Sequence, residues 1–185
     1  MPIPLREVLL GNATSAGRTV DHTSLAQPAI CAIQCALVDA YRSVGVVADV
    51  VTGHSIGEIA ALYAAKALTL QQALLIAAHR GQVMGDLPEG GAMTALLTDS
   101  EAAQRLIQST NSTAVIATMN GSSSTVVAGT SEAVKKVAEA AEHNEIAVRS
   151  LTVSHAFHSP LMQDAVEPFR EKLSDLMETL SLIHI

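Results

Sequence analysis

A short β-branched run that breaks at a Gly-x-Ser-x-Gly pattern constrains this chain more than any other feature. Residues 49–58 read Asp-Val-Val-Thr-Gly-His-Ser-Ile-Gly-Glu, and an Ala-rich segment follows. A strand, a sharp turn and a helix in this order form a nucleophile elbow, which exposes one serine because the flanking glycines lack Cβ atoms that would clash. The pattern predicts a strand at 46–52, a helix at 59–65 and a candidate nucleophile at Ser55.

The motif also has a plainer interpretation, because two glycines around a serine occur in ordinary Gly-rich turns. Its position between a β-branched run and an Ala-rich helical segment favours the elbow. In an elbow, the start of the helix contributes partial positive charge and free backbone N–H groups, which suit a developing oxyanion. We therefore expect Ser55 to attack a carbonyl carbon.

The composition indicates an ordinary soluble domain. The 185 residues fit one domain with a small subdomain, and aliphatic side chains must fill its core, because 49% of the residues are hydrophobic and only 2% are aromatic. A net charge of -7 without a basic cluster argues against nucleic acid or an anionic membrane as a partner. We expect neither a signal peptide nor a membrane span, and we predict a cytoplasmic location. Cys31 and Cys35 are interpreted as buried thiols, not as a disulfide or a metal site.

Helical patterns dominate the first half of the chain. The predicted helices cover 5–10, 29–44, 59–65 and 70–84. Pro28 stands just before the second of these, where a helix can begin, and Thr69 with Gln72 forms a capping box for the fourth. Together with the strand at 46–52, these elements indicate part of an α/β sheet flanked by helices.

After the Pro-Glu-Gly-Gly run at 88–91 the elements alternate differently. The predicted order is strand 92–97, helix 98–109, strand 113–119, a turn at Asn120-Gly121, strand 125–128, helix 131–143 and strand 146–153. This βαββαβ order is the split βαβ of ferredoxin-like subdomains. A loop with two histidines and a polar helix at 162–179 follow. We predict a partial α/β hydrolase-like large subdomain at 1–89 and 154–185, and a ferredoxin-like small subdomain at 90–153.

Two long motifs stand on either side of the predicted small subdomain. They are Gly-His-Ser-Ile-Gly-Glu at 53–58 and Ser-His-Ala-Phe-His-Ser-Pro-Leu-Met at 154–162. In this order they resemble the nucleophile motif and the histidine loop of the acyltransferase domain of polyketide synthases and of malonyl-CoA:acyl carrier protein transacylases, over nearly all the chain. The resemblance implies transfer of a malonyl-type acyl group from coenzyme A to the phosphopantetheine thiol of an acyl carrier protein, in polyketide or fatty acid synthesis. The resemblance implies no bound cofactor. It also implies that the parent protein contains neighbouring synthase domains.

The same resemblance implies the catalytic roles. Ser55 is the nucleophile, and His158 takes its proton and later activates the carrier thiol, because a serine hydroxyl needs a base within hydrogen-bond reach. The Ile56 N–H faces the oxyanion. His155 is the alternative base, although the family match places the base at the second histidine and leaves His155 as a pocket or loop residue. His54, beside the nucleophile, is expected to be structural or to line the substrate.

Further residues are implied as substrate contacts. Arg80 matches the family arginine that pairs with the free carboxylate of a malonyl group, as a planar guanidinium can; the alternative is an exposed arginine at a helix C-terminus. Ile56 and the quartet at 155–158 resemble the malonyl-selecting form, in which Phe157 fills the space that an α-methyl group would need. Discrimination by one methyl group amounts to only ~1–3 kcal/mol. Asn120 matches a pocket segment, and a plain Asn-Gly turn is the alternative.

The chain also departs from the family pattern. Family members are longer and begin with a Gly-Gln-Gly loop that completes the oxyanion hole, and a downstream segment orients the base. Neither is recognisable here, so we expect an internal fragment that is weakly active or inactive alone, since one lost donor can cost ~10²–10³ in rate. The last six residues abandon the polar pattern of the helix predicted at 162–179.

Two other functions are compatible with parts of the sequence. An esterase or thioesterase of α/β-hydrolase type would pass the acyl group to water, but that fold expects an acidic residue and then a histidine after the serine, without a ferredoxin-like insert. A non-enzymatic segment would only dock a carrier protein or a neighbouring domain. Comparing the rates of hydrolysis and carrier loading distinguishes an esterase or thioesterase from an acyltransferase. Carrier binding without turnover would identify a docking segment.

Overall fold

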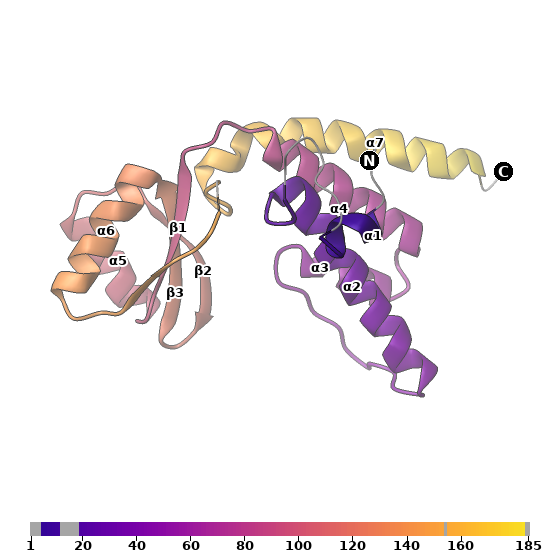
Figure 1. Ribbon diagram of the computed structural model, residues 1–185, viewed down its shortest axis with the longest axis horizontal. Coiled ribbons are helices and arrows are strands. Elements are labelled where there is room, and N and C mark those ends of the chain that lie inside the picture. Colours follow the sequence, from indigo (N-terminus) through magenta and orange to yellow (C-terminus); the bar gives the residue numbers. More distant parts are fainter. Residues whose placement is uncertain (1–4, 12–18, 154, 184–185) are drawn as a thin grey trace. The chain divides into compact units, whose positions relative to one another are not determined.

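The computed structural model describes residues 5–11, 19–153 and 155–183. It divides into two compact units, Met1–Asp86 with Glu167–Ile185, and Leu87–Val166. Figure 1 labels most of their elements. Within the described residues, no helix combines the length and the apolar character that crossing a membrane requires.

The first unit is helical. Its elements are α1 (Leu5–Leu9), α2 (Thr23–Ser43), α3 (Gly57–Ala64), α4 (Leu70–Gly85) and α7, which runs from Val166 to Ile183. Mostly small side chains form the core in which α2, α3 and α4 meet: Cys31, Cys35, Ala60, Ala73 and Ala77, together with Ile59. Such side chains let helix backbones approach closely, and α2 and α4 share the most extensive contact of the unit.

The predicted helices are present, and the largest boundary error is at the start of α2. The capping box of Thr69 and Gln72 begins α4 as predicted. However, α2 begins at Thr23, not after Pro28, because the His22 side chain accepts a hydrogen bond from the Ser24 N–H and caps the helix there. Pro28 therefore lies inside the helix, where it cannot donate a backbone hydrogen bond and its ring crowds the carbonyl of residue 24.

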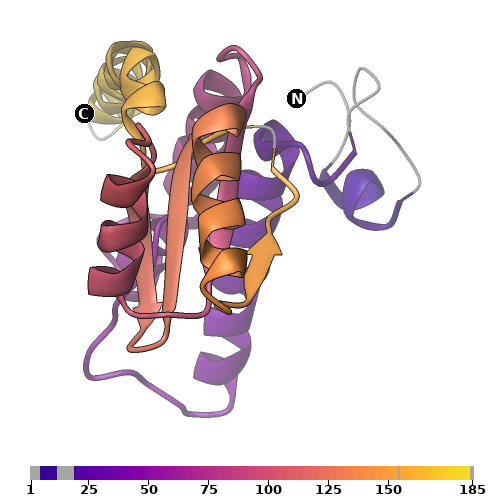
Figure 2. The ribbon, with the colours of Figure 1, turned by 90° about the vertical axis from the view of Figure 1, so that its left-hand side faces the viewer.

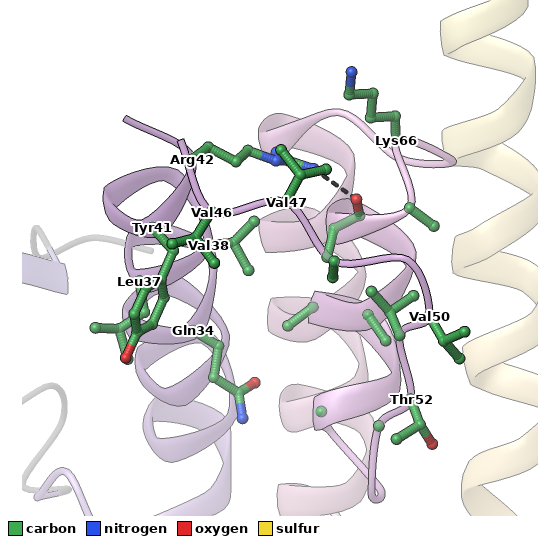
Figure 3. Close-up of a pocket in the computed structure, with 18 of the residues that line it drawn as sticks. Gln34, Leu37, Val38, Tyr41, Arg42, Val46, Val47, Val50, Thr52 and Lys66 are labelled. Carbon is green, nitrogen blue, oxygen red and sulfur yellow. Dashed lines mark hydrogen bonds between the residues drawn. The ribbon is translucent and has the colours of Figure 1, made fainter. Parts of the chain in front are cut away.

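The predicted strand at 46–52 is wrong. These residues form no strand, and Val47 and Val50 are 77% and 86% exposed. A strand needs a hydrogen-bonded neighbour, and every strand of the described residues belongs to the sheet of the other unit. The valines instead line a groove of about 1340 Å³ together with Leu37 and Tyr41 of α2 (Figure 3). The hydrogen bond from Arg42 Nη2 to the Ala64 carbonyl, 2.6 Å, lies at this groove.

The second unit is built on a four-stranded antiparallel sheet in the order β2-β3-β1-β4. Its elements are β1 (Gly91–Leu96), α5 (Ser100–Ser109), β2 (Val115–Gly121), β3 (Ser124–Thr130), α6 (Ser131–His143), β4 (Val148–Ser150) and the 3-10 helix η1 (Pro160–Ala165). Figures 1 and 2 show α5 and α6 side by side on one face of the sheet. Strands and helices thus alternate in the predicted βαββαβ order.

The two faces of this sheet have separate cores. Because successive strand residues point to opposite faces, Val127 packs beneath α5 and α6, while Val126 and Ala128 pack on the other face. That second core also contains Ala156 and, at its edge, Phe157. The loop after β4 therefore packs against this sheet, whereas the predicted small subdomain ends at residue 153.

Several boundaries differ from the predicted ones by a few residues. α5 begins at Ser100 and not at residue 98, because the Asp99 carboxylate accepts from the Ala102 N–H at 2.7 Å and caps the helix there. The turn after β2 lies at 122–123 and not at Asn120-Gly121, since β2 continues through Gly121. The last strand covers only Val148–Ser150, and η1 precedes the final helix.

Gly81 sets how closely α4 approaches α2. A Cβ atom at this position would lie 2.7 Å from the Thr23 carbonyl oxygen and 3.3 Å from Gln27 Cβ. We expect Gly81→Ala to lower the free energy of unfolding by about 1–2 kcal/mol, because overpacking against backbone outweighs the better helix propensity of alanine. Urea unfolding measures the change. Gly57→Ala is the matched control, since its Cβ would meet only Gln34 at 3.6 Å; equal midpoints for the two variants would contradict the prediction.

The two cysteines are free thiols inside the helical core, as predicted. The Cys31 and Cys35 sulfur atoms lie 4.0 Å apart, and burial raises the pKa of Cys31 to about 12. At pH 8 only about one Cys31 in 10⁴ is therefore a thiolate, the form that reacts with alkylating agents. We expect iodoacetamide to modify Cys31 only after unfolding in urea, as measured by peptide mass. Rapid modification of the folded protein at pH 8 would contradict this.

Candidate active site

The turn at Ser55 has the strained geometry of an elbow. Ser55 has a φ of 55°, a left-handed conformation that costs a non-glycine residue roughly 1–2 kcal/mol. A Cβ atom at Gly53 would lie 2.3 Å from the Glu58 nitrogen, so only glycine fits there. At Gly57 an added Cβ would make ordinary contacts, so the expected clash exists at the first glycine alone. The chain thus closes tightly around a half-buried Ser55.

The start of α3 differs from the expectation of several free N–H groups. The N–H groups of Gly57, Glu58 and Ile59 donate to the carbonyls of His54, Ser55 and Ile56 at 3.0, 3.1 and 3.2 Å. These three donors are occupied within the turn. The Ile56 N–H remains the candidate for the oxyanion, as the sequence predicts, and the His54 side chain is exposed.

Arg80 of α4 lies beside the candidate nucleophile. Its Nη2 donates to Ser55 Oγ at 3.4 Å, and its Nη1 donates to Gln27 Oε1 at 2.5 Å. Burial lowers the pKa of Arg80, and the negative charge of Glu58 opposes that effect. The alternative of a solvated arginine at a helix end does not fit a half-buried side chain with these two partners. A positive charge therefore stands next to the Ser55 hydroxyl.

Gln27 is the polar residue of this site that the sequence analysis missed. It is 6% exposed, and its Nε2 donates to Thr23 Oγ1 at 2.8 Å and to Met84 Sδ at 3.4 Å. The wrong start of α2 placed Gln27 outside the helix. The signal that could have found it is the pair of Thr23 and Gln27, which are four residues apart and therefore share a helix face.

The histidine loop belongs to the second unit, and its first histidine is an anchor. The His155 side chain is 1% exposed, and its Nε2 donates to the Leu87 carbonyl at 2.9 Å. Its ring centroid lies 6.0 Å from that of Phe157. A Cβ atom on Gly91 would lie 2.2 Å from the Ala156 nitrogen, so the loop fits closely against β1. This burial suits the interpretation of His155 as a hydrogen-bonded loop histidine.

His158 differs from His155 in both exposure and backbone. Its side chain is exposed, and its φ is 58°. Ser159 Oγ donates to the Ala156 carbonyl at 2.6 Å and accepts from the Leu161 N–H at 3.2 Å, which holds the backbone on both sides. The two predicted catalytic residues, Ser55 and His158, thus both occupy left-handed backbone, a strain that clusters at functional sites. They belong to different units, and their pairing stays a prediction.

Asn120 lies near the end of β2 with an exposed side chain, and Thr118 Oγ1 donates to its Oδ1 at 3.2 Å. The alternative of a plain Asn-Gly turn is wrong, since β2 continues through Gly121, and the pocket role of Asn120 stays a prediction. In the described part of the chain, no group of three or more His, Cys, Asp or Glu residues is arranged to hold a metal ion.

Comparison with known proteins identifies the family. The acyl transferase domain family matches residues 3–184. Polyketide synthase GfsA of Streptomyces halstedii is 44% identical over 169 residues, which cover 90% of this chain and 2% of GfsA. Mycoketide-CoA synthase of Mycobacterium tuberculosis is 40% identical over 166 residues, which cover 90% of this chain and 4% of that protein.

Comparison with solved structures leads to the same family. The acyltransferase domain from the second module of the salinomycin polyketide synthase has a TM-score of 0.81 at 38% identity, over 91% of this chain and 39% of that one. The malonyl CoA-acyl carrier protein transacylase of Coxiella burnetii has a TM-score of 0.83 at 28% identity, over 92% and 55%. The chain thus spans about half or less of these solved chains. It belongs to the acyl transferase domain family.

Proposed function

We propose that the protein carrying this chain moves a malonyl-type acyl group from coenzyme A to the phosphopantetheine thiol of an acyl carrier protein, through an acyl-enzyme on Ser55. The observation that carries the proposal is the Arg80 guanidinium, whose Nη2 lies 3.4 Å from Ser55 Oγ. A cation at this distance is within reach of the free carboxylate of a short diacid attached to that oxygen. Family membership supports acyl transfer in general.

The proposed reaction has two half-reactions. Ser55 Oγ attacks the thioester carbonyl carbon while His158 takes its proton, and the Ile56 N–H faces the oxyanion that forms. The C–S bond then breaks, and coenzyme A leaves with the proton from His158. In the second half-reaction the carrier thiol gives its proton to His158 and attacks the ester. The C–O bond breaks, and Ser55 recovers its proton.

The size of the acyl group is the second element of the proposal. Phe157 packs at the edge of the core beneath the histidine loop, and the buried His155 stands 6.0 Å from it. With both rings held, Phe157 would exclude an α-methyl branch, an effect of only ~1–3 kcal/mol. We therefore propose a preference for malonyl over methylmalonyl groups, with His54 and Asn120 as further contacts.

The fold is a further element of the proposal. We infer that the helical unit belongs to an α/β hydrolase-like large subdomain, and that 90–153 is a ferredoxin-like small subdomain. The sharp turn at Ser55, which leads directly into α3, supports the first part. The antiparallel order β2-β3-β1-β4 supports the second.

The proposed function is tested by incubating the full-length protein that carries this chain with malonyl-CoA. We expect a malonyl mass on the peptide that contains Ser55, and its loss on addition of a carrier protein with a phosphopantetheine thiol. Ser55→Ala is the control and should carry no added mass. An unmodified wild-type peptide would refute the transfer function. An adduct that water removes as fast as the carrier does would instead identify the esterase or thioesterase alternative.

A further inference from the structure

Gln27 is the residue that holds Arg80 in place. Its Oε1 accepts from Arg80 Nη1 at 2.5 Å, while its Nε2 donates to Thr23 Oγ1 at 2.8 Å and to Met84 Sδ at 3.4 Å. Turning the amide around would place its N–H₂ against the guanidinium, where both groups are donors. The chemistry of the partners therefore determines which end of the amide faces Arg80.

This contact orders the guanidinium that stands beside the nucleophile. One terminal nitrogen of Arg80 is bound by Gln27, and the other lies 3.4 Å from Ser55 Oγ. An unrestrained arginine has many rotamers and loses about 2 kcal/mol of side-chain entropy when it is ordered. Because Gln27 is buried and bound on both sides, much of this ordering is present before a substrate arrives.

The absence of charge on Gln27 matters as much as its hydrogen bond. A carboxylate in this place would form an ion pair with Arg80 and compete with an incoming carboxylate. A carboxamide orients the guanidinium equally well and leaves its positive charge un-neutralised. Glu58 acts on Arg80 through its charge, and this interaction favours the cation without replacing the Gln27 contact.

We propose that Gln27 is a positioning residue that orients the Arg80 cation without neutralising it, and that it thereby selects acyl groups with a free carboxylate. The inference rests on the proposed function and adds a second residue to its substrate selection. The close contact of α4 with α2 at Gly81 brings Arg80 within reach of Gln27.

The test compares two thioesters on the Gln27→Glu variant of the full-length protein. The variant is nearly the same size, keeps an oxygen facing Arg80 and adds one negative charge. We expect kcat/KM for loading of Ser55 from malonyl-CoA to fall about 10- to 100-fold, mainly through KM, because the cation is already paired. Loading from acetyl-CoA, which has no free carboxylate, should stay within about threefold of wild type.

A second variant separates orientation from charge. Thr23→Val removes the acceptor of the Gln27 Nε2 without changing size, and Thr23 is 7% exposed. We expect a smaller loss that is again confined to malonyl-CoA. Equal losses for both thioesters in either variant would show a merely structural role and overturn the inference, as would unchanged malonyl loading in Gln27→Glu. Failure of the wild-type protein to load malonyl-CoA would instead refute the proposed function, and this inference with it.

Discussion

Replacing His158 with asparagine is expected to slow acylation of Ser55 by about 10²–10⁴-fold, the usual contribution of a general base. Asparagine is the appropriate substitution because His158 has a φ of 58°, and asparagine tolerates left-handed backbone better than most residues. The loop should therefore keep its shape while the proton acceptor is lost. Rapid-quench measurement of the malonyl adduct on Ser55 gives the rate.

Two control variants make this result specific. His143→Asn changes an exposed histidine at the end of α6 and should have no effect on the rate. His155→Asn removes the anchor to the Leu87 carbonyl and should lower the stability of the loop. A wild-type rate of acylation in His158→Asn would show that His158 is not the base and would refute its proposed role.

Replacing Arg80 with methionine is expected to reduce loading from malonyl-CoA about 10²-fold and to leave loading from acetyl-CoA unchanged or raised. Methionine keeps the packing of the arginine stem but removes the charge, and loss of one partner from a desolvated charge pair costs about 2–5 kcal/mol. The change also leaves Gln27 Oε1 without its donor, which should lower the free energy of unfolding by about 1–3 kcal/mol. Competition between the two thioesters measures the selectivity directly.

The matched control is Arg105→Met, because Arg105 is an exposed arginine of α5 that forms a 3.9 Å ion pair with Glu101. Its loading rates and selectivity should be those of wild type. If Arg80→Met loses malonyl and acetyl loading to the same extent and is less stable, Arg80 supports the fold and does not recognise the acyl group. A selectivity ratio equal to that of wild type would have the same meaning.

Much of the candidate site is visible in local sequence. The glycine and serine spacing at 53–57 predicts a sharp turn, and the structure has one, with Ser55 at positive φ. The pattern could not show that Gly57 has room for a side chain, because that depends on Gln34 of another helix. Likewise, the sequence leaves His155 and His158 as rivals for one role. Their different burial arises from packing on the sheet, which no local pattern contains.

The sequence by itself determined the elements whose hydrogen bonds close within a few residues. The capping box of Thr69 and Gln72 and the helix Ser131–His143 are examples, because their partners are near neighbours along the chain. Only the tertiary structure decided where groups distant in sequence meet. Gln27 reaches Arg80 across 53 residues because two helices pack closely at a glycine. Residues 46–52 form no strand because the strands of the described residues all lie in the sheet of the other unit.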